Sequence, residues 1–205
     1  MPELATACSQ IVAAIRPILA RRSPILVALD GGSGAGKSTL AAMLEQEIES
    51  VVIPLDDFYS ASIPDGEWDS RPIPERARDV FDWARLRTDA LEPLLAGRPA
   101  RWFPFDFVSG MRPDGTYGLS PHAIEKQPAN VIILEGAYSS NPEIADLIDL
   151  AVLVDVPVAE RHQRLDRRES DQRFLKRWHA LWDGVEDYYF SEVRPTSAFD
   201  LVVRG

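Results

Sequence analysis

The chain has 205 residues, of which 45% are hydrophobic, and a formal net charge of −10 at pH 7. This length predicts a single α/β domain, residues 1–205, with a sizeable core, and the acidic balance argues against a nucleic-acid partner. The only cysteine, Cys8, excludes an internal disulfide and a cysteine-rich zinc site, and it suits a cytoplasmic protein. His122, His162 and His179 are scattered along the chain and show no metal-binding spacing.

Residues near the N-terminus predict a helix that packs on the rest of the domain. Apolar side chains recur there with helical spacing, at Ile11, Val12, Ile15, Ile18 and Leu19. Glu3 precedes this stripe and Arg16 interrupts it, whereas a signal peptide begins with positive charge and continues with an unbroken apolar run. No segment approaches the roughly 20 apolar residues of a membrane span, so we expect no membrane partner.

Short runs rich in Val, Ile and Leu predict strands that are buried on both faces. These runs lie at 25–29, 51–55, 131–135, 150–156 and 200–203. Helical patterns lie between most of them or close to them, at 38–49, 82–96, 157–168 and 171–190. The alternation of strands and helices favours a parallel, doubly wound sheet with helices on both faces.

Two segments need a further interpretation. Residues 54–128 are rich in proline and aromatic residues, and we expect the helix at 82–96 to divide them and aromatic loops to cover the carboxyl ends of the strands, where ligands bind. The helix at 171–190 carries a stripe of large apolar residues on one face, and we interpret its tryptophans as core packing. Its members are Phe174, Leu175, Trp178, Leu181, Trp182 and Val185.

Residues 31–39 form a complete phosphate-binding loop. They fit G-x-x-x-x-G-K-[ST], follow an apolar strand and precede a helix, so an unrelated glycine-rich turn is a poor alternative. The glycines let backbone N–H groups turn toward one anion, and the following helix presents its positive end to it. Lys37 is placed to reach the β- and γ-phosphates, and Ser38 to ligate Mg²⁺. The expected nucleotide-binding residues are Gly32, Ser33, Gly34, Ala35, Gly36, Lys37, Ser38 and Thr39.

Carboxylates follow two of the predicted strands. Asp56 comes directly after the strand at 51–55, where it would face the γ-phosphate and could accept the proton of an attacking alcohol. It could instead hold Mg²⁺ through water, or belong to an Asp pair that caps a turn. Glu135 ends the strand at 131–135 in the Walker B pattern, which usually orients Mg²⁺ and in some ATPases activates water.

Three arginines share one face of the helix that begins after Pro157. Arg161, Arg164 and Arg168 fall at i, i+3 and i+7. Phosphoryl transfer requires positive charge over the γ-phosphate, which a small helical lid at about 158–175 would supply. The alternative is a solvated charged face, because acidic residues are interleaved, namely Glu160, Asp166 and Glu169.

Together these motifs resemble the uridine kinase and phosphoribulokinase superfamily of P-loop kinases, over roughly residues 24–204. The similar segments are Asp56-Asp57-Phe58-Tyr59, residues 79–86, residues 105–109, Ile133-Leu134-Glu135-Gly136 and residues 199–203. The resemblance implies a P-loop NTPase fold, a three-layer sandwich with a central parallel sheet and a small lid. It also implies the use of ATP with Mg²⁺ and a small-molecule alcohol as acceptor.

The resemblance also implies roles for individual residues. Asp56 corresponds to the catalytic base, and Lys37, Arg164 and Arg168 complete the catalytic set. Glu135 joins Ser38 at the metal. The implied acceptor-binding residues are Asp57, Tyr59, Phe105, Asp106 and Arg112. For the aromatic residues of this region, core packing is the rival interpretation.

Two positions depart from the uridine kinase pattern. Gly110 stands where those kinases carry a histidine that contacts the base, and Arg76 stands where they carry an aspartate that holds the ribose. Trp68 or Asp69, which lie nearby, could replace that aspartate. A site built on hydrogen bonds does not lose such groups without changing its ligand, so the departures argue against uridine as acceptor.

The sequence therefore predicts an ATP-dependent kinase that phosphorylates a nucleoside-, sugar- or vitamin-like alcohol. The alternatives are a nucleotide hydrolase and an ATP-binding regulatory protein. The chain carries neither the N-K-x-D motif of GTPases nor the L-S-G-G-Q motif of transporter ATPases. The intact set of Lys37, Ser38, Asp56 and Glu135 speaks against a site that binds without transfer.

Overall fold

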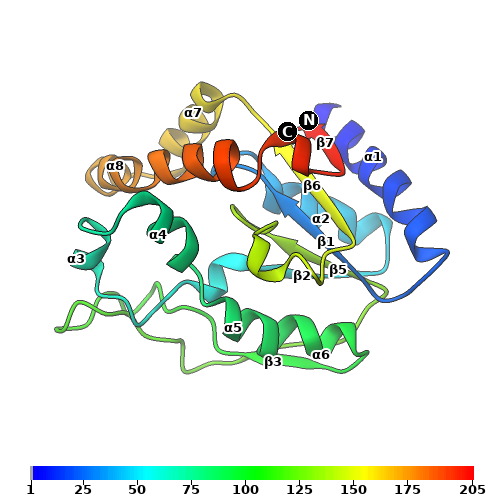
Figure 1. Ribbon diagram of the computed structural model, residues 1–205, viewed down its shortest axis with the longest axis horizontal. Helices are drawn as coiled ribbons and strands as arrows, with labels where there is room; N and C mark the ends of the chain where they lie inside the picture. The colour runs from blue at the N-terminus through cyan, green and yellow to red at the C-terminus, as the bar shows by residue number, and fades with distance from the viewer. Residues whose placement is uncertain (1) are drawn as a thin grey trace.

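A five-stranded parallel sheet lies at the centre of the computed structural model, which describes residues 2–205 (Figure 1). The strands lie in the order β2-β5-β1-β6-β7, and every neighbouring pair is parallel. Their bounds are β1 Ile25–Asp30, β2 Ser50–Pro54, β5 Val131–Glu135, β6 Leu150–Asp155 and β7 Leu201–Arg204. The five predicted strands are confirmed, each to within one residue at either end.

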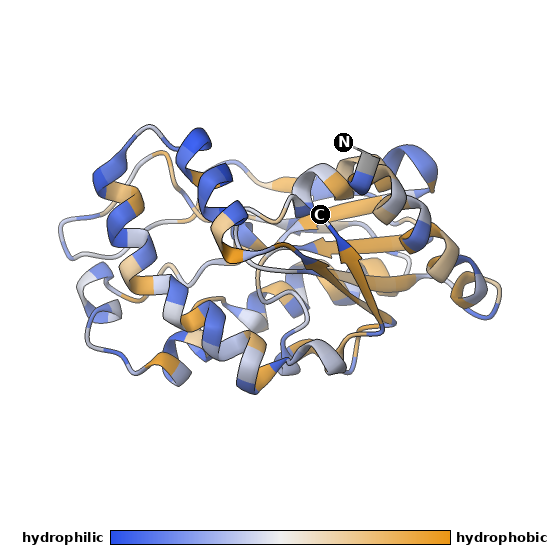
Figure 2. Cartoon of the chain, turned by 90° about the horizontal axis from the view of Figure 1, so that it is seen from above, coloured by the Kyte–Doolittle hydropathy of each residue, from blue (hydrophilic) through white to orange (hydrophobic). Residues whose placement is uncertain are grey.

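The sheet is buried on both faces, as the unbroken apolar runs predict. Successive side chains of a strand point to opposite faces, and in β1 Leu26 packs into one core whereas Val27 and Leu29 pack into the other. Figure 2 shows the consequence, strands that are hydrophobic along most of their length beside helices of mixed character. Each fully buried Leu or Ile contributes about 1.5–3 kcal/mol.

Helices cover both faces and complete the three predicted layers. On one face lie α1 Pro2–Leu19 and α2 Lys37–Glu47, whose apolar residues share a core with β1. On the other face a helical stretch contains α5 Trp83–Arg85, the π-helical turn Leu86–Leu91 and α6 Glu92–Leu95. No helix within residues 2–205 has both the length and the apolar character needed to cross a bilayer.

The remaining helices gather near the carboxyl ends of the strands. α7 Val158–Arg168 and α8 Gln172–Tyr188 lie side by side, and α8 continues into the π-helical turn Tyr189–Val193. The short helices α3 Asp65–Trp68 and α4 Ile73–Asp79 lie beside α8. The remaining helical pieces are the 3₁₀ turns Leu55–Phe58, Pro142–Ile144 and Thr196–Ala198.

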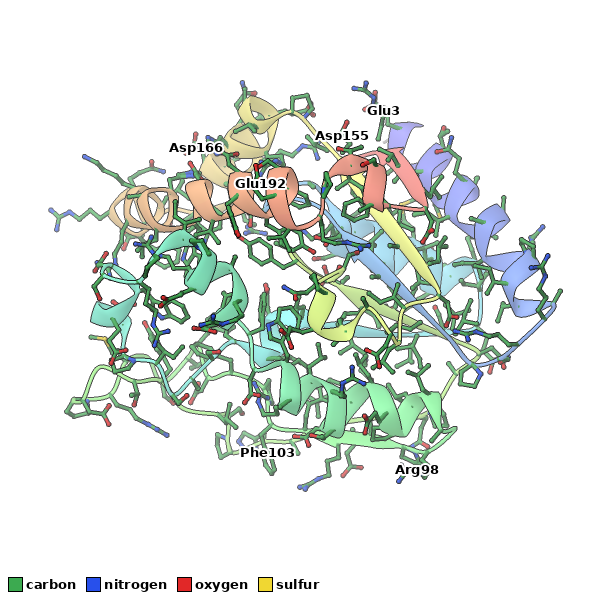
Figure 3. The ribbon with its side chains drawn as sticks, in the orientation of Figure 1. Glu3, Arg98, Phe103, Asp155, Asp166 and Glu192 are labelled. Carbon is green, nitrogen blue, oxygen red and sulfur yellow. The ribbon has the colours of Figure 1, made fainter. Side chains whose placement is uncertain are left out.

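The segment 54–128 is more structured than the sequence predicts. Besides α3 and α4 it contains an antiparallel hairpin of β3 Ala100–Trp102 and β4 Ile124–Lys126. Trp102 of this hairpin is 1% exposed, whereas the neighbouring Phe103 points outward at the edge of the molecule (Figure 3). These elements are three to seven residues long, which is too short for a periodic pattern to be recognised.

Candidate active site

The phosphate loop connects β1 to α2 at the carboxyl edge of the sheet. Lys37 opens α2, is 7% exposed, and donates hydrogen bonds from Nζ to the carbonyl oxygens of Gly31 (2.8 Å) and Gly32 (3.1 Å). Its ammonium group therefore lies inside the curve of the loop. Gly34 and Gly36 take positive φ angles of 82° and 93°, which side-chain-bearing residues rarely adopt.

The loop fits an anion. The backbone N–H groups of Gly34 and Gly36 donate to no other residue of the described chain, and both glycines border a cavity. Unsatisfied N–H groups at the start of a helix, together with its dipole and a lysine ammonium, form a site for phosphate. The observed loop thus supplies the donors that a bound nucleotide requires.

A buried carboxylate anchors the start of the loop. Asp30, at the end of β1, is 0% exposed and accepts hydrogen bonds from the N–H groups of Gly31 (2.7 Å), Tyr138 (2.8 Å) and Ser140 (2.9 Å) and from the Tyr189 hydroxyl (2.8 Å). Burial raises the pKa of Asp30, and these hydrogen bonds oppose that rise. The sequence analysis missed this residue, because it stands in the chain only as the last residue of an apolar strand.

The backbone of Tyr138, which donates a hydrogen bond to Asp30, has an unfavourable conformation. Its φ angle is 71°, the only positive value among the non-glycine residues that the structure describes. Such a conformation costs about 1–3 kcal/mol and persists only where the surroundings determine it. The carboxylate of Asp30 therefore fixes the loop after β5 as well as the phosphate loop.

A buried ion pair holds the backbone of Ser33. Arg161 of α7 and Glu186 of α8 lie 2.8 Å apart, with side chains 9% and 4% exposed. Glu186 also accepts from the Ser33 N–H (2.9 Å), and Arg161 donates to the Ser33 carbonyl oxygen (3.0 Å). Arg161 was predicted to share one helix face with Arg164 and Arg168. No pattern in the sequence predicted the role of Glu186.

The two residues predicted at the metal lie in contact. The Ser38 hydroxyl donates to Oε1 of Glu135 at 3.1 Å, so α2 and β5 bring two oxygen ligands together. Oxygen ligands of this kind are the ones that Mg²⁺ prefers. Burial raises the pKa of Glu135, and the positive charge of Lys37 opposes the rise. This donor set fits Mg²⁺.

Asp56 borders the same cavity from the turn that follows β2. The residue is accessible to solvent through the cavity, yet enough protein surrounds its carboxylate to raise its pKa by desolvation. The charges of Lys37 and Arg168 and a hydrogen bond with Tyr59 oppose that rise. Asp56 is therefore held between the lysine of the phosphate loop and an arginine of α7.

Asp57, the next residue, lies in a different environment. Its carboxylate accepts a hydrogen bond from Nε1 of Trp102 at 2.8 Å, and its carbonyl oxygen accepts from the Phe105 N–H. It does not border the cavity. Its contacts tie the turn to the β3–β4 hairpin, and its role in acceptor binding stays a prediction.

One cavity of about 360 Å³ collects most of the predicted site. The predicted residues that line it are Ser33, Gly34, Gly36, Lys37, Ser38, Thr39, Asp56, Tyr59, Glu135, Arg164 and Arg168. Lining residues that the sequence analysis did not assign to the site are Gly136, Ala137, Leu165, Glu169, Phe174, Leu175 and Trp178.

The predicted lid arginines differ in their contacts. Arg164 reaches the carbonyl oxygens of Gly34 (3.4 Å) and Ala35 (3.3 Å) and pairs with Glu160 (2.6 Å). Arg168 borders the cavity, is exposed, and makes no ion pair or hydrogen bond with the described residues. Arg164 therefore binds the backbone of the phosphate loop. The guanidinium charge of Arg168 remains unpaired within residues 2–205 and acts on Asp56.

Comparisons with known proteins relate the chain to kinases. The family model of the Zeta toxins matches residues 9–68, which include the phosphate loop and Asp56. A curated uridine kinase of Halobacterium salinarum is 29% identical over 178 residues, 82% of this chain and 71% of that protein. A uridine kinase of Mycoplasma pneumoniae is 28% identical, covering 87% and 84% of the two chains.

Solved structures show the same fold. A possible uridine kinase from Bacillus stearothermophilus superposes with a TM-score of 0.66 at 20% identity, covering 98% of this chain and 97% of that one. A putative fructose transport system kinase from Silicibacter sp. TM1040 gives 0.56 at 24% identity, covering 97% and 98%. The chain is therefore similar in sequence to uridine kinases over most of its length and shares the fold of P-loop kinases. As an enzyme it is a phosphotransferase with an alcohol group as acceptor.

In this kinase the residues of the implied acceptor loop lie away from the cavity. Phe105 packs against Tyr59 and Phe107, with ring centroids 5.7 and 4.6 Å apart. Asp106 accepts from two N–H groups of its own loop, those of Val108 and Ser109. Arg112 is exposed. Their part in acceptor binding stays a prediction.

The apolar stripe of α8 divides between the core and the cavity of the kinase. Trp182 packs on Trp68, with ring centroids 5.4 Å apart, as the core interpretation predicts. Phe174 and Trp178 instead border the cavity, and Phe174 is 55% exposed. The core interpretation, made for the tryptophans, is therefore wrong for Trp178. Helical spacing alone does not distinguish a core from the wall of a cavity.

The position that departs most clearly from uridine kinases has a structural role here. The Arg76 guanidinium donates to three backbone carbonyl oxygens, among them those of Asp69 (3.0 Å) and Leu181 (3.1 Å), so it ties α4 to α8. Trp68 is 8% exposed, and the Asp69 carboxylate pairs with Arg177 at 3.3 Å. None of these side chains borders the cavity.

Proposed function

We propose that this kinase transfers the γ-phosphoryl group of MgATP to a hydroxyl group of a nucleoside-, sugar- or vitamin-like small molecule. The observation that supports it most strongly is the shared cavity: Asp56 borders it together with Lys37 and Arg168. A proton acceptor and two cations around one volume are what in-line transfer to an alcohol requires.

Residues of the phosphate loop would hold the nucleotide. The N–H groups of Gly34 and Gly36 would donate to phosphate oxygens, and Lys37 would exchange its loop carbonyls for the β- and γ-phosphates. Ser38 and Glu135 would hold Mg²⁺, which supplies positive charge against the phosphate oxygens when bound. Because Asp30 and the Arg161–Glu186 pair already fix the loop, little rearrangement would accompany binding.

Asp56 is the proposed general base. The alcohol oxygen forms a bond to the γ-phosphorus, the bond to the bridging oxygen breaks, and the alcohol proton passes to the Asp56 carboxylate. A carboxylate whose pKa is raised by burial is a better proton acceptor than an ordinary one. Arg168 would stabilise the charge that spreads over the transferred group. Positioning and charge carry most of the rate enhancement in such reactions.

We propose the class of the acceptor, a small-molecule alcohol, and not one compound. The curated relatives are named for uridine, but Arg76 is engaged with backbone carbonyls and Gly110 offers no side chain. A ribose and a pyrimidine would therefore lose two partners that the uridine kinase pattern supplies. We expect uridine to be a poorer acceptor than the physiological alcohol.

A panel of alcohols incubated with MgATP and the kinase tests this function. The expected result is a phosphomonoester in amounts equal to ADP with at least one acceptor, and very slow phosphate release without any. Phosphorus NMR distinguishes the two products. Phosphate release that is equally fast with and without alcohols would show a hydrolase instead. Nucleotide binding with no turnover for any alcohol would favour a regulatory ATP-binding protein.

A further inference from the structure

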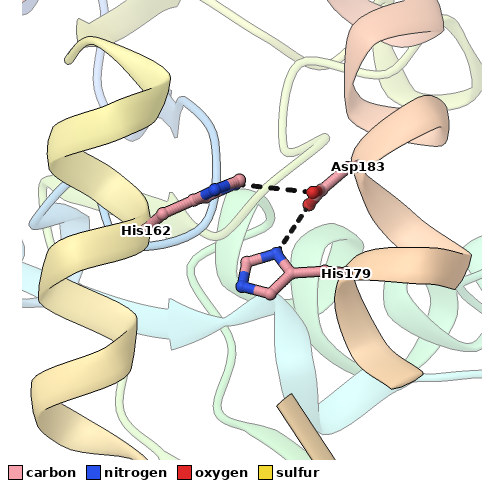
Figure 4. A group of neighbouring side chains, drawn as sticks. All are labelled: His162, His179 and Asp183. Carbon is pink, nitrogen blue, oxygen red and sulfur yellow. Dashed lines mark hydrogen bonds and ion pairs between the residues drawn. The ribbon is translucent and has the colours of Figure 1, made fainter. Parts of the chain in front are cut away.

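Two histidines and an aspartate meet at the contact between α7 and α8 (Figure 4). Nδ1 of His179 lies 2.9 Å from Oδ1 of Asp183, one turn further along α8, and Nε2 of His162 on α7 lies 3.5 Å from Oδ2 of the same carboxylate. The ligand atoms of the three residues all lie within 4.8 Å of one another. The spacing of the histidines in the sequence did not predict this cluster.

The donor set is that of a zinc site. Two imidazole nitrogens and a carboxylate oxygen bind Zn²⁺ with bonds of about 2.0–2.2 Å, and tetrahedral geometry then places the donors about 3.3 Å apart. The separations of 2.9 and 3.5 Å lie on either side of that value. All three residues are partly exposed, so an ion can enter and the side chains can rotate slightly to meet it.

This cluster differs in chemistry and place from the proposed magnesium site. Imidazole favours first-row transition metals, whereas the hydroxyl and carboxylate of Ser38 and Glu135 favour Mg²⁺. None of the three clustered residues borders the cavity. An ion here would therefore act on the arrangement of the helices and not on the phosphates directly.

The cluster lies where an ion would link α7 to α8, beside the Arg161–Glu186 ion pair. His162 follows Arg161 on α7, and Asp183 lies about one turn before Glu186 on α8. The ion would cross-link the same two helices that the Arg161–Glu186 pair joins. It would thereby hold α7, which carries Arg164 and Arg168, at a fixed distance from the rings of α8 that border the cavity.

We propose that His162, His179 and Asp183 bind one divalent transition-metal ion, with Zn²⁺ preferred, and that this ion clamps α7 to α8. The fourth ligand is water, as in other sites with three protein ligands. Because the ion binds the folded chain, it stabilises that chain by mass action. Without an ion the cluster is a polar contact of two imidazole rings with the Asp183 side chain, and the experiment distinguishes the two states.

The test uses the full chain, stripped of metal and kept in excess Mg²⁺ so that oxygen-ligand sites are filled. Titration with Co²⁺ should give the visible absorption of four-coordinate cobalt, saturating at one ion per chain and displaced by Zn²⁺. His162→Gln and His179→Gln should each weaken binding at least tenfold. His122→Gln, in an exposed loop, is the matched control and should leave binding unchanged.

Three results would overturn the proposal. They are no saturable cobalt absorption, absorption that survives both histidine variants, and equal losses in the His122→Gln control. Thermal melting supplies a measurement that needs no variant: Zn²⁺ in excess Mg²⁺ should raise the melting temperature of the stripped chain, and an unchanged temperature contradicts the site. Asp183→Asn, which keeps the size of the side chain, should remove most of that rise.

Discussion

Buried polar groups hold the phosphate-loop side of the molecule together, whereas ring packing dominates a second, aromatic side within residues 56–126. On the first side Asp30 and Glu186 bind loop N–H groups from positions without solvent access. On the second, Tyr59 stacks on Phe81 at 4.6 Å and Phe105 lies against Tyr117 at 5.0 Å. Every enzyme that binds a nucleotide binds the same phosphate groups. The phosphate loop therefore requires hydrogen-bond donors that are held in fixed positions.

The two kinds of contact respond differently to change. A buried polar group that loses its partner costs the full desolvation of the group left behind. Ring packing weakens in proportion to the contact removed. Substitutions on the phosphate-loop side should therefore have large, abrupt effects, and those on the aromatic side smaller, graded ones.

Glu186→Ala should have the largest effect on stability. It leaves the Arg161 guanidinium buried and unpaired and removes the acceptor of the Ser33 N–H. We expect a loss of about 3–5 kcal/mol in the free energy of unfolding, measured by urea denaturation. Glu160→Ala, which breaks the exposed pair with Arg164, is the control and should cost about 1 kcal/mol or less. Equal losses would contradict the distinction.

Lys37→Ala should reduce turnover by about 10²–10³-fold, because it removes a cation that faces the charge of the transition state. Its effect on unfolding should be much smaller than that of Glu186→Ala. Steady-state kinetics with saturating acceptor measure the loss. Lys176→Ala, on an exposed position of α8, is the control. Turnover of the Lys37 variant close to that of the parent enzyme would refute the assignment of the phosphate loop.

Trp102→Phe tests how the aromatic side responds to the loss of one contact. The ring volume is largely kept, but Asp57 loses the Nε1 hydrogen bond in a half-buried position. We expect about 1–3 kcal/mol of destabilisation and no change in the KM for ATP. Phe103→Leu, at the exposed neighbouring position, should change stability by less than about 0.5 kcal/mol. A raised KM for ATP in Trp102→Phe would show that the two sides are not independent.

Arg168→Gln should lower turnover, because Arg168 is proposed to stabilise the transferred group. It should also shift the pH dependence, which is the smallest of the effects predicted here. Arg168 lowers the pKa of Asp56 against the rise caused by burial, so its removal raises that pKa further. A base must be deprotonated to act, and activity is lost as pH falls through its pKa. The acid limb of the kcat/KM profile should therefore move to higher pH, by less than about one unit. Arg167→Gln, on an exposed position of α7, should not move it.

Local patterns predicted most of what the phosphate-loop side contains. Lys37, Ser38 and Glu135 belong to short motifs that were recognised in the sequence. The apolar run at 25–29 predicted the β1 strand. Asp30 was missed because three of its four partners, Tyr138, Ser140 and Tyr189, come from distant parts of the chain. Glu186 was missed for the same reason, since it lies 25 residues from Arg161 on another helix.

The aromatic stripe of α8 was harder to predict, for a physical reason. Trp178 and Trp182 occupy successive turns of one helical stripe, yet one borders the cavity and the other packs on Trp68. Trp68, the partner of Trp182, belongs to α3, a helix of four residues whose place the α8 sequence does not predict. A hydrophobic stripe predicts that a surface is covered, but the partner that covers it is set by long-range packing.

Single-turnover transfer by Asp56→Asn tests the central claim most directly. With MgATP and acceptor both saturating, the rate of phosphomonoester formation should fall by about 10²–10⁴-fold, because the amide cannot take the alcohol proton. The Kd for ATP should stay within a few-fold of the parent value. Transfer at the parent rate, with ATP still bound, would contradict the account, because Asp56 would then not be the base.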